Sequence, residues 1–129
     1  MTTRRILIID DQEAIQAAVE FGLRLVAGWQ VLTASSAAQG IQTALAEQPD
    51  AILLDLMMPD MDGIAALREL QAHSATAPIP VILLTAKAQL AEEQQFNHLG
   101  VSGVIAKPFN ALNLPNQIAR ILHWQSQSS

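Results

Sequence analysis

Five polar side chains in this sequence follow short apolar runs, and their types suit one kind of chemistry. Asp10 and Asp11 follow residues 6–9, Asp55 follows residues 51–54, Thr85 follows residues 81–84, and Lys107 follows residues 104–106. Three carboxylates in a chain without cysteine form an all-oxygen ligand set that suits Mg²⁺. A lysine and a hydroxyl add a positive charge and a hydrogen bond for phosphoryl oxygens. A carboxylate can itself accept a phosphoryl group and form an aspartyl phosphate.

These residues meet only if the apolar runs are strands of one parallel sheet. The runs at residues 6–9, 51–54, 81–84 and 104–106 are short and continuous, as in strands covered on both faces, and residues 29–32 add an alternating run. Segments with helical spacing of apolar residues lie at residues 12–27, 36–47, 64–72, 88–99 and 114–124. Crossovers between parallel strands are right-handed, so the helices must divide between the two faces. The sequence therefore predicts a doubly wound α/β fold with a five-stranded parallel sheet.

In such a sheet, ligands bind beyond the carboxyl ends of the strands, where the strand order reverses. The five polar side chains are therefore expected to converge on one edge, which explains why Asp55 ends an otherwise buried run. At the last predicted helix, Asn113 is expected to act as the cap and Pro115 to lie in the first turn.

Composition excludes several classes of protein. The 129 residues, half of them hydrophobic, suffice for one domain with a substantial core. Seven basic and twelve acidic residues give a net charge of −5, the wrong sign for a phosphate-backbone binder, so no nucleic-acid partner is expected. The N-terminal apolar stretch is too short for a signal peptide, and no apolar run approaches the roughly 20 residues of a membrane span. A cytoplasmic protein with no membrane partner is therefore expected.

Four motifs, in order and with matching spacing across nearly the whole chain, resemble a known family. They are "IDD" at residues 9–11, "LLDLMMPDMDG" at residues 53–63, "LLTA" at residues 83–86 and "AKPF" at residues 106–109. Together they are similar to the signatures of the receiver domain of two-component response regulators. The resemblance implies a flavodoxin-like strand order, 2-1-3-4-5. Residues 1–124 are then expected to be a receiver of the stand-alone type, and residues 125–129 a polar, disordered tail.

The resemblance also assigns a phosphoacceptor and a metal site. It implies that Asp55 accepts the phosphoryl group. Asp11 and Asp55 would bind Mg²⁺ directly, together with the backbone carbonyl of Met57, and Asp10 would act through water.

Further residues would contact the phosphoryl group or take part in a switch. The resemblance implies that Thr85 bonds a phosphoryl oxygen, that the small Ala86 lies beside it, and that Lys107 pairs with Asp55 or its phosphate. The peptide bond between Lys107 and Pro108 is typically cis in this family. Where the family usually has an aromatic switch residue, this sequence has Val104.

The function implied is a phosphoacceptor in a two-component or phosphorelay system. A sensor histidine kinase or a histidine phosphotransferase would donate the phosphoryl group, and phosphorylation would change binding to an unidentified protein target. The domain would not be an enzyme beyond assisting its own phosphorylation and dephosphorylation. The predicted helix at residues 88–99 is polar, with little apolar surface to bury in a permanent dimer, so a mainly monomeric protein is expected.

Two alternatives stay open. The first is a pseudo-receiver, an interaction module with this fold but no phosphorylation. Val104 favours it, and it is opposed by the intact set of Asp10, Asp11, Asp55, Thr85 and Lys107. The second is a Mg-dependent aspartyl phosphatase-type enzyme, which places a second acid two residues after its nucleophile. This sequence has Met57 there, so that alternative is the weaker one. A nucleotide-binding Rossmann domain lacks support because the first turn has no glycine-rich motif.

Overall fold

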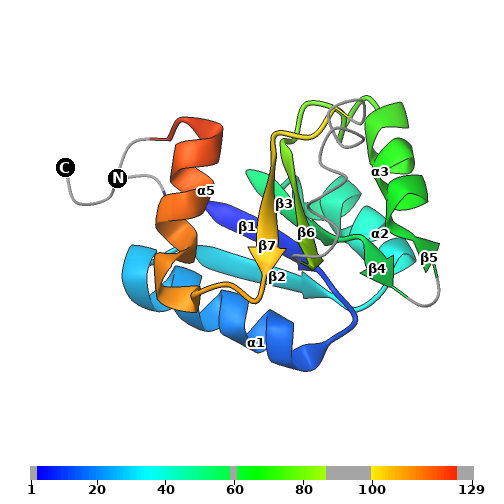
Figure 1. Cartoon of the computed structure of the whole chain (residues 1–129). Coiled ribbons are helices and arrows are strands. Elements are labelled where there is room, and N and C mark those ends of the chain that lie inside the picture. Colours follow the sequence, from blue (N-terminus) through cyan, green and yellow to red (C-terminus); the bar gives the residue numbers. More distant parts are fainter. Residues whose placement is uncertain (1–2, 59–60, 87–99, 125–129) are drawn as a thin grey trace.

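Five parallel strands form the centre of the molecule. The computed structural model describes residues 3–58, 61–86 and 100–124. One sheet runs in the order β2-β1-β3-β6-β7 (Figure 1). Its strands are β1 (Arg5–Ile9), β2 (Gln30–Ala34), β3 (Ala51–Asp55), β6 (Val81–Ala86) and β7 (Gly103–Lys107). Counted along the chain, these strands lie in the order 2-1-3-4-5, so the predicted flavodoxin-like fold is confirmed.

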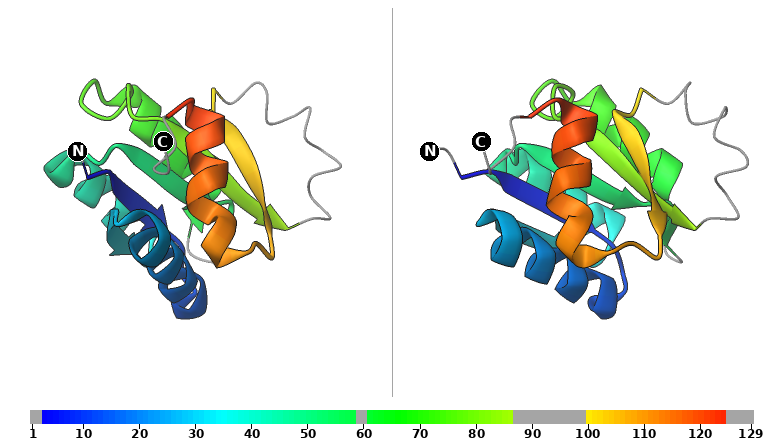
Figure 2. Two further views of the ribbon diagram at one scale, coloured as in Figure 1. Left: turned by 90° about the vertical axis from the view of Figure 1, so that its left-hand side faces the viewer. Right: turned by 60° about the vertical axis from the view of Figure 1, so that its left-hand side comes forward.

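Helices cover both faces of this sheet (Figure 2). On one face, α1 (Glu13–Gly22) continues into the π-helical segment η1 (Leu23–Ala27) and lies beside α5 (Leu114–Leu122). On the other face lie α2 (Ala37–Glu47) and α3 (Gly63–Ala72). A small antiparallel pair, β4 (Met57–Met58) and β5 (Met61–Asp62), follows β3. The helix predicted at residues 88–99 lies outside the described residues.

The strand side chains divide between two buried clusters, one on each face. Leu7 and Ile9 of β1 pack with residues of α2 and α3, and Ile6 and Ile8 pack with residues of α1 and α5. All four side chains are completely buried. Because both faces are covered, the strand reads as a continuous apolar run without alternation. The polar residues that follow such strands therefore come at the one edge where the core opens.

The second strand begins one residue later than predicted. The alternating run at residues 29–32 predicted the strand, but β2 spans Gln30–Ala34, and Trp29 lies just before it, buried in the core. Pairing with β1 sets these bounds, since Arg5 aligns with Gln30 and Ile9 aligns with Ala34.

The start of α5 differs from the predicted capping arrangement. A 3-10 turn, η4 (Ala111–Asn113), precedes the helix, and the Asn110 side chain accepts a hydrogen bond from the Leu112 backbone N–H at 3.0 Å. Asn113 occupies the N-cap position, as predicted, but its side chain makes no capping hydrogen bond. A capping side chain needs an extended backbone, whereas Asn113 has φ −94° and ψ −6°. Pro115 does lie in the first turn, as predicted.

Candidate functional site

The carboxyl ends of the central strands bring the candidate residues to one edge of the sheet. Asp55 is the last residue of β3 and aligns with Leu84 of β6, so Thr85 follows one position further along the neighbouring strand. Lys107 ends β7 and aligns with Ala86. The predicted convergence arises because parallel strands all end on the same side of the sheet.

Three carboxylates form the acidic part of this edge. One oxygen each from Asp10, Asp11 and Asp55 lies within 4.8 Å of the other two. Asp10 is completely buried and Asp55 is 4% exposed, whereas Asp11 is more open to solvent. Buried carboxylates are unfavourable unless compensated, so this cluster requires positive charge nearby.

Lys107 supplies part of that charge. Its Nζ donates to Asp10 Oδ2 at 2.9 Å and lies 3.4 Å from Asp55 Oδ1. The peptide bond from Lys107 to Pro108 is cis. Three carboxylates and one ammonium group leave a formal charge of −2. A divalent cation would bring this cluster to neutrality.

The donor set fits Mg²⁺ by its chemistry. Mg²⁺ takes hard oxygen ligands at about 2.0–2.1 Å and commonly keeps several waters beside one or two carboxylates. The three carboxylates offer such oxygens, and the more open position of Asp11 leaves a side accessible to water. Met57, whose carbonyl the resemblance adds to this set, lies in β4, two residues after Asp55.

The side chain of Asp10 is held from two directions, which sequence reasoning did not foresee. Its Oδ2 accepts from Lys107, and its Oδ1 accepts from the backbone N–H of Gln12 at 2.9 Å. The signal available in the sequence was an acid two residues before the predicted helix at residues 12–27, which favours a local turn of this kind. Asp10 therefore orients Lys107 as well as adding negative charge.

Thr85, Ala86 and Val104 differ in exposure. Thr85 is 1% exposed, whereas Ala86 is exposed at the end of β6. Val104 aligns with Leu83 and packs, partly buried, against the cluster that contains Leu7. Thus Thr85 and Ala86 lie on the strand next to Asp55, and Val104 lies on the strand beyond.

Gly63 holds the segment that follows Asp55 close to α3. A Cβ at this position would lie 2.7 Å from Leu56 Cα and 3.0 Å from the Asp55 carbonyl oxygen, so only glycine fits. The Gly63 N–H also donates to the Leu56 carbonyl at 3.3 Å. Gly63 ends the motif at residues 53–63, but this close approach has no signal in a single sequence.

A family model assigns the chain. The model of the response regulator receiver domain matches residues 6–119, so the chain belongs to the response regulator receiver domain family. Chemotaxis response regulator CheY4 of Vibrio cholerae is similar in structure, with a TM-score of 0.84 and 28% identity, covering 93% of this chain and 99% of that one.

In the residues that the structure describes, no helix is both long and apolar enough to cross a membrane.

Two further relatives bear on the site and on length. The receiver domain of sensor histidine kinase PA1611 from Pseudomonas aeruginosa has a TM-score of 0.81 and 30% identity, with coverage of 95% of this chain and 99% of that chain, and holds a magnesium ion in its active site cleft. The DNA-binding dual master transcriptional regulator RpaA of Synechocystis sp. is 37% identical over 118 residues, 92% of this chain and 48% of RpaA. The chain spans about half the length of the curated relatives it matches.

Proposed function

We propose that this domain is a phosphoacceptor in which Asp55 takes a phosphoryl group from a phosphohistidine, with Mg²⁺ held by Asp11, Asp55 and the Met57 carbonyl and, through water, by Asp10. A sensor histidine kinase or a histidine phosphotransferase is the donor. The observation that carries the proposal is the convergence of three carboxylates and Lys107 at one sheet edge. The magnesium-bound receiver of PA1611 supports the metal assignment.

The chemistry follows from the positions of the side chains. A carboxylate oxygen of Asp55 attacks phosphorus, the bond from phosphorus to the imidazole nitrogen breaks, and the imidazole leaves with that electron pair. Bound Mg²⁺ supplies neutralisation of charge on the transferring oxygens. Lys107, already near Asp55, pairs with one phosphoryl oxygen, and the Thr85 hydroxyl donates to another. Such transfer depends mainly on positioning and charge, which these side chains provide.

Incubation with acetyl phosphate and Mg²⁺, followed by intact mass measurement, tests this proposal. The wild-type chain should gain one phosphoryl group, and Asp55→Asn should gain none. Asp62→Asn, which changes an acid a few residues further along the chain, is the matched control and should still gain it. Undiminished phosphorylation of Asp55→Asn would show that another residue is the acceptor. No gain by the wild type would favour the pseudo-receiver alternative.

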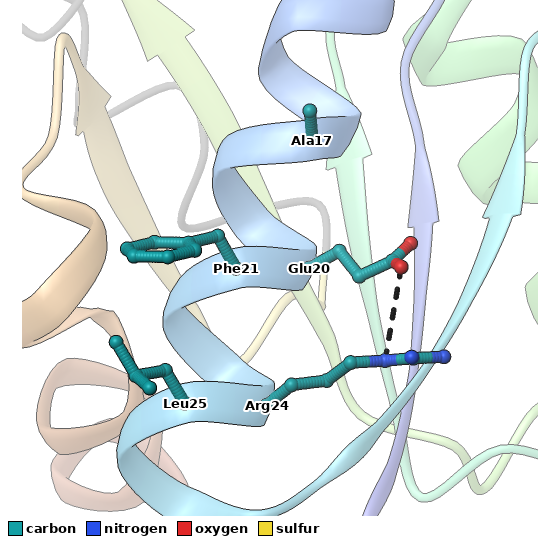
Figure 3. A pocket seen from close by; sticks show the side chains of 5 residues that line it. All are labelled: Ala17, Glu20, Phe21, Arg24 and Leu25. Atoms are coloured by element: carbon teal, nitrogen blue, oxygen red, sulfur yellow. Dashed lines mark ion pairs between the residues drawn. The ribbon is translucent and has the colours of Figure 1, made fainter.

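An exposed apolar surface supports docking of a protein donor. It is made of three exposed apolar side chains: Phe21 on α1 (58% exposed), Leu25 on η1 (64%) and Leu112 on η4 (49%). Figure 3 shows Phe21 and Leu25 projecting from one side of the helix, while Glu20 and Arg24 form an ion pair of 3.7 Å on another side. Both α1 and η4 begin within a few residues of the acidic edge, after Asp11 and Lys107 respectively. This surface therefore lies on elements that begin close to the acidic edge, so a protein docked on it would be near Asp55.

The docking role has a test of its own. Replacing Phe21 and Leu25 together by serine should slow transfer from a phosphorylated histidine phosphotransferase and leave phosphorylation by acetyl phosphate unchanged. Leu45→Ser on α2, also an exposed apolar residue, is the control and should leave both rates unchanged. Equal losses with both donors would contradict a docking role.

A further inference from the structure

The side-chain amide of Gln16 lies against the backbone of the proposed metal site. Its Nε2 donates to the Asp10 carbonyl at 2.6 Å and to Ser35 Oγ at 3.1 Å, and it lies 3.4 Å from the Ala34 carbonyl. All three partners are oxygens, so the side chain must present its NH₂ group to them. One amide of α1 thus joins the carboxyl ends of β1 and β2.

We infer that Gln16 is a positioning residue of the metal site, which fixes the peptide between Asp10 and Asp11. The inference rests on the proposed function, because it concerns how tightly that site binds Mg²⁺. The Asp10 carbonyl belongs to the rigid peptide plane that leads into Asp11. Holding its oxygen therefore limits the rotation that would swing the Asp11 carboxylate away from Asp55.

Asp10 is fixed at every other polar group as well. Its N–H donates to the Ala34 carbonyl at 3.0 Å, and its two carboxylate oxygens accept from the Gln12 N–H and from Lys107. The bond from Gln16 completes this set at the carbonyl. Asp11 is the more exposed ligand, so its place in the site depends on the backbone that Gln16 holds.

The same amide links the site to the start of α2. Ser35, which accepts from Gln16, donates its backbone N–H to Gln39 Oε1 at 2.9 Å, and the Gln39 N–H donates to the cap residue Ser36 at 3.1 Å. Gln39 therefore supports the helix start without touching Asp10 in this network. This difference makes Gln39 a matched control for Gln16.

Titration calorimetry with MgCl₂ at constant ionic strength tests the inference. Gln16→Met keeps the size of the side chain and removes its hydrogen-bond donors. It should weaken Mg²⁺ binding about five- to tenfold, near the low end of the losses caused by removing residues that orient metal ligands. Gln39→Met should lower the melting temperature through the loss of a partner at the α2 cap, yet bind Mg²⁺ within about twofold of wild type. A second variant, Gln16→Asn, keeps the amide on a shorter stem and should lose affinity as Gln16→Met does.

Each result distinguishes the inference from the proposed function. Wild-type affinity in both Gln16 variants would overturn the inference and leave the phosphoacceptor proposal intact. An equal loss in Gln39→Met would also overturn it, because general loosening beside β2 would then explain the effect. Absence of Mg²⁺ binding by the wild type would instead overturn the proposed metal site. Circular dichroism of each variant identifies any that does not fold, and the remaining Gln16 variant then decides.

Discussion

Lys107 lies between two buried carboxylates but is closer to one of them. Its Nζ is 2.9 Å from Asp10 Oδ2 and 3.4 Å from Asp55 Oδ1. The tighter contact holds the ammonium group in place, and the longer one leaves it room to follow oxygens added to Asp55. Asp10 and Lys107 therefore act as one unit. The Asp10 carboxylate positions the Lys107 ammonium group, and that ammonium group compensates the charge of both Asp10 and Asp55.

Removing the Lys107 ammonium group should destabilise the metal-free protein. Lys107→Met leaves Asp10 and Asp55 buried without their ammonium partner, which we expect to lower the free energy of unfolding by about 2–3 kcal/mol. Saturating Mg²⁺ should recover much of the loss, because it brings positive charge to the same carboxylates. Urea unfolding with and without Mg²⁺ measures both effects.

An exposed ion pair provides the comparison. Arg24→Met removes the partner of Glu20 in a pair whose side chains are 59% and 41% exposed, and it should cost no more than about 0.5 kcal/mol at either Mg²⁺ concentration. If Lys107→Met were as stable as wild type without Mg²⁺, Lys107 would not be compensating the acidic cluster.

Magnesium should raise the melting temperature, and Asp11 should be required for this. A ligand that binds only the folded state stabilises it, and each tenfold loss of affinity removes about 1.4 kcal/mol of that stabilisation. Asp11→Ala removes one of three converging carboxylates, so its melting temperature should respond little to Mg²⁺. Differential scanning fluorimetry across a MgCl₂ series measures the response. Glu13→Ala, a nearby exposed acid, should keep the wild-type response; a full response in Asp11→Ala would remove Asp11 from the metal site.

Gly63→Ala should disturb the segment carrying Asp55. The added Cβ would lie 2.7 Å from the Leu56 Cα, a backbone clash that no side-chain rotation can relieve. We therefore expect the free energy of unfolding to fall by about 1–3 kcal/mol and phosphorylation by acetyl phosphate to slow. Gly28 offers the comparison, since its φ of 70° penalises a Cβ but nothing lies within 4 Å. Gly28→Ala should lose stability and keep the wild-type phosphorylation rate. A normal phosphorylation rate in Gly63→Ala would show that the site tolerates the shift.

Much of the site could be predicted because it depends on topology. Parallel strands end at one edge, so residues directly after them, such as Asp10, Asp55 and Lys107, must come close once the strands are recognised. The short apolar runs at residues 6–9 and 51–54 marked those ends without ambiguity. The strand order followed from the family resemblance rather than from periodicity.

Details that depend on side-chain geometry could not be predicted from the sequence. Two examples are the hydrogen bond from the Gln16 side-chain amide to the Asp10 carbonyl and the capping role of Asn110. Each depends on backbone angles that the sequence does not give. Trp29 was included in a strand, yet it lies before β2 with its ring at 80° to that of Trp124, their centroids 5.5 Å apart. Strand pairing and ring packing between residues far apart in sequence determine this placement.

Val104 should limit the conformational change that phosphorylation produces. It aligns with Leu83 and packs against the core, and a β-branched side chain is short and stiff at χ1. It cannot swing inward when Thr85 moves, as the aromatic residue usual in this family at this position would. The coupling between phosphorylation and partner binding should therefore lie toward the low end of the usual range of about 1–3 kcal/mol.

Amide NMR and sedimentation of the free and beryllofluoride-bound protein test this limit. We expect shifts centred on Thr85 and Ala86, small shifts along α5, and a mainly monomeric protein in both states, because the predicted polar helix at residues 88–99 offers little apolar surface. Val104→Phe, which puts an aromatic residue at the switch position, is the matched variant and should extend the shifts toward α5. Large shifts throughout α5 in the wild type, or complete conversion to a dimer, would show that the switch works without an aromatic side chain at residue 104.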